Sequence, residues 1–376
     1  MSNDRRAAVR IVLKALSAFI VLNLAFALLV PVPALGRVSV YNTLVPGRER
    51  LPYGDVPAKA YNLSLYDLNA MFSSHVVSHP KAPGEYRVVL IGDSSTWGWF
   101  LRPGDTLAGL INAQRLRTKD GRQVRVYNLG YPIMSLTKDV LMLSRALQYQ
   151  PDLIVWPMTL ESFPAAKQLS HPIVQNNAAE VRALITRYQL RIDPNDPAFF
   201  SPTFLDRTLI GQRRALADWL RLQAYGPLWG ATGVDQYYPD TYEPAARDLE
   251  ADPTFAGLHP PALAKDSLAL DVLASGIKMA RDRRVPLLVI NEPILVSQGK
   301  NSDVRYDFFY PRWAYDQYRT LLRDHVPTGV AGVQYLDVWD AVPEREFTNS
   351  AVHLSPAGAR IFADKVSPAI QAIIGS

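Results

Sequence analysis

The chain has 376 residues, 48% hydrophobic and 20% charged, a composition typical of a globular protein and incompatible with general disorder. Its formal net charge of +5 is small for this length, and no stretch interleaves basic with aromatic residues, so nucleic-acid binding is not expected. The absence of cysteine excludes thiol nucleophiles, disulfide bonds and cysteine-ligated metals.

The first 36 residues predict a membrane segment. A polar, basic start (residues 1–10) precedes an almost continuous apolar stretch from Ile11 to Leu35, and about 20 such residues cross a bilayer as a helix. By the positive-inside rule, the N-terminus is cytoplasmic and the main domain extracytoplasmic. We predict a single-pass anchor in the cell membrane. The alternative is a cleaved signal peptide, because Ala34-Leu35-Gly36 ends in small residues at a suitable spacing.

Residues 37–84 contain many prolines, glycines and aromatic side chains and are predicted to form an irregular juxtamembrane connector. His75 and His79 are four positions apart and would share one face of a helix. No carboxylate cluster lies near them in the sequence, so we predict neither a metal site nor a cofactor.

From residue 85 the sequence alternates between strand and helix patterns. Short apolar runs predict buried strands at Arg87–Ile91, Val124–Leu129, Asp152–Met158, Pro286–Ile290 and Val333–Val338. Helices are expected at Trp99–Gln114, Leu136–Gln148 and Pro356–Ile374. This alternation predicts an α/β fold, a three-layer, doubly wound parallel sheet of about five strands. Ligands of such sheets bind beyond the carboxyl ends of the strands.

The alternation stops between Phe163 and about Leu263. Amphipathic helices are expected at Ala178–Tyr188 and Thr208–Ala224, before an aromatic, proline-rich segment. We therefore predict a mostly helical insertion, residues 164–279, that caps the site. The catalytic domain would comprise residues 85–163 and 280–376. The aromatic stretch Leu222–Trp229 either packs within the insertion or touches the membrane.

Two motifs carry candidate chemistry. Ser94 lies in Gly92-Asp93-Ser94-Ser95-Thr96-Trp97-Gly98, directly after the first strand, where the free amides of a following helix could stabilise an oxyanion. The alternative is an ordinary turn with a capping serine. His353 precedes a helix start marked by Ser355 and Pro356, and it is the candidate general base.

The Gly-Asp-Ser turn and the His-Leu-Ser-Pro-Ala-Gly run resemble the first and last blocks of the SGNH, or GDSL, hydrolases. The resemblance implies a flavodoxin-like fold with Ser94 as nucleophile, His353 as base and Asp93 in a structural role. It also implies that the Ser94 and Gly130 amides bind the oxyanion together with an asparagine after the third strand. That asparagine is replaced here by Glu161, whose carboxylate would repel an oxyanion unless it is protonated or turned away. Thr159, Glu161 and Ser162 are the candidate donors at this position.

The family also places an aspartate three residues before the histidine, a position held here by Ser350. The side chain that orients His353 therefore has to come from elsewhere. The candidates are Asn349, Asp337, Asp340 and Glu292. An asparagine can orient a histidine through its side-chain oxygen, but it brings no charge to stabilise the imidazolium.

An anchored SGNH-like domain also resembles envelope acyl-transfer proteins, such as the D-alanine-transfer protein of teichoic acid synthesis and the alginate and peptidoglycan O-acetyltransferases. The resemblance implies a serine esterase or O-acyltransferase acting on a cell-envelope glycan or glycolipid, beside a multi-pass membrane O-acyltransferase partner. The alternative is a catalytically degenerate adaptor that binds glycan or such a partner.

Overall fold

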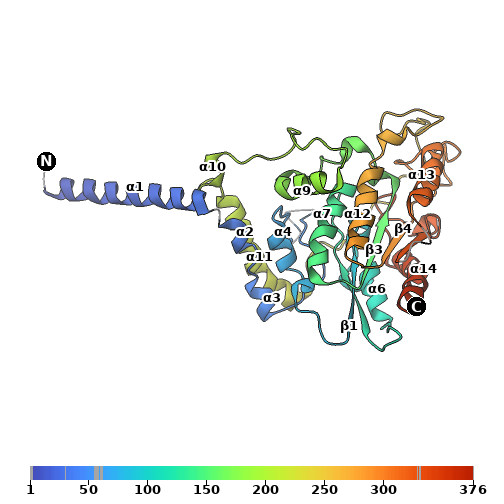
Figure 1. The fold of residues 1–376 in the computed structure, drawn as a ribbon, viewed down its shortest axis with the longest axis horizontal. Coiled ribbons are helices and arrows are strands. Elements are labelled where there is room, and N and C mark those ends of the chain that lie inside the picture. Colours follow the sequence, from blue (N-terminus) through green and yellow to red (C-terminus); the bar gives the residue numbers. More distant parts are fainter. Residues whose placement is uncertain are drawn as a thin grey trace.

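The structure, a computed structural model, describes residues 3–29, 31–54, 59, 62–327, 329 and 332–375. Five parallel strands form one sheet in the order β2-β1-β3-β4-β5 (Figure 1). Their bounds are β1 Glu85–Leu90, β2 Gln123–Asn128, β3 Leu153–Met158, β4 Leu287–Asn291 and β5 Val333–Asp337. The predicted doubly wound parallel sheet is confirmed, and the strand order reverses between β1 and β3.

Helices cover both faces of the sheet. Val88 and Leu90 of β1 face a core shared with α6 (Leu107–Ala113) and α14 (Pro356–Ile374). Val89 and the following Ile91 face the opposite core, shared with α7 (Leu136–Ala146) and α12 (Leu270–Asp282). Because successive residues of a strand point to opposite faces, a strand buried on both faces is apolar throughout. This explains the continuous apolar runs in the sequence.

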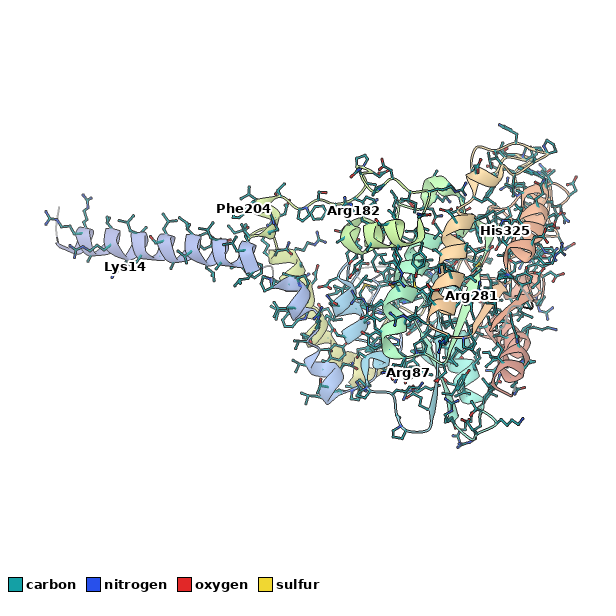
Figure 2. The ribbon with its side chains drawn as sticks, in the orientation of Figure 1. Lys14, Arg87, Arg182, Phe204, Arg281 and His325 are labelled. Carbon is teal, nitrogen blue, oxygen red and sulfur yellow. The ribbon has the colours of Figure 1, made fainter. Side chains whose placement is uncertain are left out.

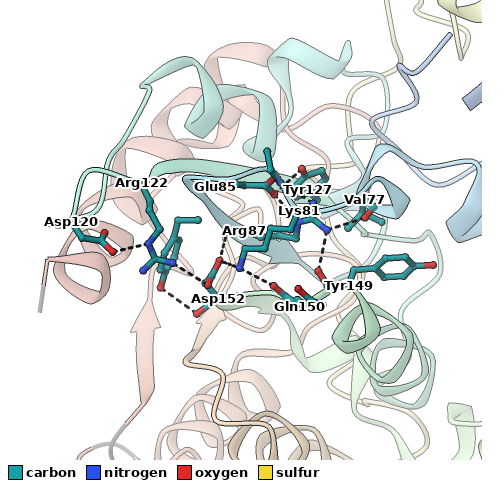
Figure 3. Close-up of polar contacts among 12 residues, drawn as sticks. Val77, Lys81, Glu85, Arg87, Asp120, Arg122, Tyr127, Tyr149, Gln150 and Asp152 are labelled. Atoms are coloured by element: carbon teal, nitrogen blue, oxygen red, sulfur yellow. Dashed lines mark hydrogen bonds and ion pairs between the residues drawn. The ribbon is translucent and has the colours of Figure 1, made fainter. Parts of the chain in front are cut away.

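A polar network closes the amino end of β1 (Figure 3). Buried Arg87 pairs with Glu85 at 2.6 Å and donates to the carbonyls of Val77 and Tyr149 at 3.1 and 3.0 Å. Asp152 accepts from the Arg87 amide at 2.6 Å. These bonds tie the connector and the 3-10 turn that follows α7 to the amino end of β1, opposite the carboxyl ends of the strands.

The N-terminal helix α1 spans Asn3–Leu29, so it ends before the predicted boundary at Leu35. Pro31 follows, and its lack of a backbone amide removes a hydrogen bond that would continue the helix. A short α2 (Val32–Leu35) comes next. Among the described residues, the segment Arg5–Leu29 alone is long and apolar enough to cross a membrane, and little of its surface is buried in the protein.

The connector is more ordered than its composition indicates. It forms α3 (Val40–Leu44), α4 (Leu68–Ser73) and the 3-10 turn η1 (Val76–Ser78). Tyr41, Leu51 and Phe72 are buried in the core that also holds α7. The His75 and His79 rings both bond the backbone, at the Val77 amide and the Asn42 carbonyl. The connector is therefore part of the packed domain.

Two predicted helices have different bounds in the structure. The helix expected at Trp99–Gln114 is confined to α6, which begins at Leu107. A separate short helix, α5 (Ser94–Trp97), precedes it and ends at Gly98, which is left-handed with φ of 89°. The helix expected at Thr208–Ala224 is α11, Arg213–Thr232. It continues through Pro227, and the preceding Gly226 packs directly against the ring of Tyr41.

The remaining helices are short or lie outside the sheet layers. They are α8 (Pro172–Asn176), α9 (Ala178–Tyr188), α10 (Phe204–Arg207) and α13 (Arg312–His325), with 3-10 turns η2 (Pro103–Asp105), η3 (Leu147–Tyr149), η4 (Leu160–Ser162), η5 (Ala165–Lys167), η6 (Lys265–Ser267) and η7 (Glu344–Glu346).

Candidate active site

Ser94 is the first residue of α5, directly beyond the carboxyl end of β1. Asp93 caps this helix, its Oδ1 accepting from the Ser95 amide at 2.8 Å. Gly92 has to be a glycine, because a Cβ there would lie 2.2 Å from Thr96 Oγ1. The Ser94 amide has no acceptor within the helix, as is general for a first helical residue, and can serve a developing oxyanion.

His353 comes from a loop at the other end of the chain. The Phe347–Leu354 bridge and a 2.8 Å bond from the Thr348 amide to the His353 carbonyl close this loop. Ser355 then caps α14 through a 3.0 Å bond from the Gly358 amide. The loop brings His353 Nε2 to 2.8 Å from Ser94 Oγ. The two residues are 259 positions apart in the chain, and the structure places them in direct contact.

Asn349 orients the imidazole. Its Oδ1 lies 2.9 Å from His353 Nδ1. An amide oxygen can only accept, so Nδ1 carries the proton and Nε2 is left to accept from Ser94 Oγ. This is the tautomer that a general base requires.

The imidazole is held neutral. His353 is 8% exposed, and its ring stacks on Trp99 with 5.3 Å between ring centroids and 10° between ring planes. Burial lowers the pKa of His353 from 6.5 to about 3. A neutral ring can accept the Ser94 proton at physiological pH, although its low pKa makes it a weak base.

The other candidate carboxylates have different partners. Asp337 accepts from Asn291 Nδ2 at 2.9 Å and pairs with Arg319 at 2.9 Å. Asp340 is exposed in the loop that follows β5. Glu292 is fully buried next to Asp93 and Ser95. Of the four side chains considered for orienting His353, Asn349 is the one bonded to it.

Glu292 instead faces Asp93 and Ser95. Burial raises the pKa of Glu292 well above its usual value, and the neighbouring Asp93 carboxylate raises that pKa further. Glu292 therefore holds a proton. Asp93 Oδ2 and both Glu292 carboxyl oxygens are buried without a hydrogen-bond partner among the described residues, so Asp93 Oδ2 is free to accept that proton in a hydrogen bond. These two buried carboxyl groups lie next to the turn that carries Ser94.

Lys138 is a third buried ionisable residue beside the turn that carries Ser94. Its ammonium is fully buried, donates to the Gly92 and Tyr131 carbonyls at 2.7 and 2.8 Å, and pairs with Asp139 at 2.6 Å. The Gly92 carbonyl also accepts from the Tyr131 amide at 2.9 Å. Lys138 thus fixes the backbone that precedes Ser94.

Gly130 packs against the nucleophile turn but its amide is engaged. A Cβ at Gly130 would lie 2.6 Å from the Trp97 amide nitrogen, so only glycine fits. The Gly130 amide donates to Asn128 Oδ1 at 3.1 Å, and Asn128 Nδ2 donates to the Thr96 carbonyl at 2.9 Å. For Gly130 to bind an oxyanion, its bond to Asn128 has to break.

The segment after β3 is held by other contacts. Thr159 Oγ1 donates to the Tyr310 hydroxyl at 3.1 Å, and the Glu161 amide donates to the same oxygen at 3.3 Å. The Glu161 carboxylate forms an ion pair with Lys167, which neutralises it. Ser162 is buried and its amide bonds the Thr159 carbonyl at 3.0 Å. A carboxylate paired in this way repels an oxyanion less than a free one.

Several supporting residues, Lys138 and Asn128 among them, were not predicted from the sequence. Trp99 stands next to the Gly-Asp-Ser motif, so its proximity was a usable signal. Arg50 had no local signal: it comes from the connector, forms a buried ion pair with Asp235, and donates to the Gly98 and Leu101 carbonyls at 2.9 and 2.8 Å. It therefore links the insertion to the end of α5.

The chain is similar in structure to three esterase-type proteins. It covers 100% of a carbohydrate acetylesterase family member from Sinorhizobium meliloti, with 77% of this chain aligned, 12% identity and a TM-score of 0.31. It covers 95% of a lipolytic G-D-S-L family protein from Veillonella parvula, with 74% of this chain aligned, 10% identity and a TM-score of 0.34. It covers 97% of an acetylxylan esterase from Geobacillus stearothermophilus, with 79% of this chain aligned, 13% identity and a TM-score of 0.36. No protein-family model and no curated protein matches the sequence.

Proposed function

We propose that the chain is a membrane-anchored serine esterase or O-acyltransferase of the SGNH type, acting on a cell-envelope glycan or glycolipid. The observation that carries this proposal is the 2.8 Å contact between Ser94 Oγ and His353 Nε2, with Asn349 on the far ring nitrogen. A nucleophile, a base and an orienting group in line are the arrangement of serine acyl transfer.

The chemistry follows from this arrangement. Ser94 Oγ attacks the ester carbonyl carbon while its proton passes to His353 Nε2. The Ser94 amide binds the oxyanion of the tetrahedral intermediate. Collapse of the intermediate breaks the ester bond, and the leaving alkoxide takes the proton from His353. The acyl-serine is then resolved by water or by an acceptor hydroxyl, which His353 deprotonates in turn.

The proposed location follows from α1. A cytoplasmic N-terminus would place the catalytic residues outside the cytoplasm, where envelope glycans and glycolipids are found. A multi-pass membrane O-acyltransferase that supplies the acyl group is part of the proposal and is suggested by the resemblance to envelope acyl-transfer proteins.

The decisive experiment uses a fluorophosphonate, which reacts with an activated serine. We expect the full-length protein in detergent to be labelled, and Ser94→Ala and His353→Ala to lose the label while keeping the same circular dichroism spectrum. A folded wild type that resists labelling would contradict the enzyme. If it is labelled, incubation with 4-nitrophenyl acetate and a glycan acceptor, with free acetate and acetylated glycan both quantified, separates hydrolysis from transfer.

A second candidate function is a non-catalytic adaptor that binds glycan or a membrane acyltransferase. The observation that favours it is the Gly130 amide, which donates to Asn128 instead of pointing to an open oxyanion site. An adaptor would bind a glycan with equal affinity in wild type and Ser94→Ala and would show no labelling.

A further inference from the structure

The exposed aliphatic side chains of the domain are concentrated in two segments of the chain. Among the described residues after Gly36, every exposed valine, leucine and isoleucine except Ile133 lies in segments 38–45 or 205–228. We call this set, which includes Val40, Leu44, Leu205, Ile210, Leu220 and Leu228, the apolar face. Leu44 and Leu205 are each 74% exposed. Exposed apolar residues concentrated in this way indicate an interaction site.

The two segments form a single layer. The Val40 amide of α3 donates to Gln223 Oε1 of α11 at 2.9 Å, and Trp219 Nε1 of α11 donates to the Val38 carbonyl at 3.3 Å. Gly226 lies against the ring of Tyr41, which is buried in the domain core. Figure 1 shows α2, α3, α10 and α11 together on the side of the domain from which α1 leaves. The layer is thus fixed both to the core and beside the anchor.

A contact with α1 fixes where this layer lies along the axis of the anchor helix. The Ile210 amide donates to Asn23 Oδ1 at 3.3 Å, and Asn23 is 8% exposed although it lies in the apolar helix. Asn23 precedes the last helical residue, Leu29, by six positions, which at 1.5 Å per residue is about 9 Å along the axis. Figure 2 shows Phe204 of α10 beside the same end of α1. Interfacial helices lie about 5–10 Å into the boundary between headgroups and acyl chains.

Basic side chains border the apolar face. Arg207, Arg213 and Arg221 are exposed on α10 and α11, and Asp218 of α11 pairs with Arg221 at 3.0 Å. On α11, Leu220, Ala224, Leu228 and Ala231 recur at helical spacing and are all exposed. Apolar and basic residues on one exposed helix are typical of binding to an anionic lipid surface.

We propose that α3, α10 and α11 form a membrane-interface layer that lies in the headgroup region of an anionic leaflet beside α1. This rests on the proposed membrane anchoring by α1. The layer would hold the domain at a fixed orientation, where a single helix alone would leave it free to swing. Asp235, three residues beyond α11, pairs with Arg50, which holds the Gly98 carbonyl, so the layer is joined to the nucleophile turn.

The absence of cysteine makes a direct test possible. Single variants Leu205→Cys and Leu228→Cys of the full chain receive a thiol-reactive, environment-sensitive fluorophore and are reconstituted into vesicles of phosphatidylcholine and phosphatidylglycerol. Nitroxide lipids, labelled near the headgroup or deep in the acyl chain, act as quenchers. Leu16→Cys in α1 reports the anchor. His325→Cys, which Figure 2 places on the side of the domain away from α1, reports the aqueous domain.

We expect the labels at 205 and 228 to be quenched several-fold more by the headgroup nitroxide than the label at 325, and the label at 16 to be quenched by the deep nitroxide. Quenching at 16 but not at 205 and 228 overturns the interface layer and leaves the anchor intact. No quenching at 16 overturns the anchor. Blue-shifted labels at 205 and 228 that neither nitroxide quenches indicate cover by a second copy, which also overturns the lipid assignment.

Discussion

Asn349 Oδ1 lies 2.9 Å from Nδ1 of His353 and occupies the place that an aspartate takes in most serine triads. Asn349→Ala removes the bond that selects the active tautomer. One such hydrogen bond contributes about 1–1.5 kcal/mol, so we expect kcat/KM for 4-nitrophenyl acetate to fall roughly tenfold. Asn349→Asp keeps the acceptor and should restore the rate. An unchanged rate in Asn349→Ala would show that the bond does not orient the base.

The second prediction concerns the dependence of activity on pH. Burial lowers the pKa of His353 from 6.5 to about 3, so the ring stays neutral as the pH falls through 6.5. We expect the acid limb of kcat/KM to lie near pH 3 and not near 6.5. Asn349→Asp should move this limb upward by about one to three pH units, because a nearby carboxylate favours the imidazolium. A wild-type limb near 6.5 would mean that His353 is solvated.

The same shift affects stability. In the folded state the lowered pKa of His353 disfavours protonation, so its contribution to stability is complete above pH 6.5 and is lost as the pH falls toward 3. We expect the free energy of unfolding, measured by chemical denaturation, to depend less on pH in His353→Gln than in the wild type across this window. Equal slopes would contradict the burial of this imidazole.

Gly130 is predicted to tolerate no side chain. In Gly130→Ala the new methyl group would lie 2.6 Å from the Trp97 amide nitrogen and 2.7 Å from Thr96 Cγ2, so α5 has to shift. We expect a loss of about 1–3 kcal/mol in stability and reduced fluorophosphonate labelling. The matched control is Gly104→Ala, where nothing lies within 4 Å of the added Cβ. Equal labelling rates in the two variants would contradict this packing.

The Arg50–Asp235 ion pair joins the connector to the insertion at 2.7 Å, and both side chains are almost fully buried. Asp235→Ala leaves the guanidinium buried without its partner and should cost about 3–5 kcal/mol in the free energy of unfolding. Arg214→Ala, which removes an exposed pair with Asp218, should change it by less than about 0.5 kcal/mol. The two variants are compared by chemical denaturation, and equal losses would contradict a special role of the buried pair.

Glu292→Gln is expected to stabilise the protein at neutral pH. Burial and Asp93 raise the pKa of Glu292 well above 4.5, so the wild type loses stability as the pH rises above 4.5 toward that raised pKa. The glutamine amide can donate to Asp93 at every pH. The difference in the free energy of unfolding between variant and wild type should therefore grow with pH in this window. A difference that does not vary with pH would show that Glu292 is ionised in the folded protein.

The sequence alone determined the strands of the sheet and identified Ser94 and His353 as the candidate nucleophile and base, because the signals for both are local. Apolar runs mark the strands, Ser355 and Pro356 mark the start of α14, and glycines mark the turn around Ser94. These features depend on backbone conformation within a few residues, so each can be recognised without knowing what packs against it.

Tertiary structure decided which side chains contact Ser94 and His353 and orient them. Four residues were candidates to orient His353, and the loop closed by Phe347 and Leu354 selects Asn349. The order of the connector, the packing of Gly226 against Tyr41 and the bond between Arg50 and Asp235 depend on contacts between segments distant in the chain. Burial, which lowers the pKa of His353 and raises that of Glu292, exists only once those segments have packed, so no local pattern encodes it.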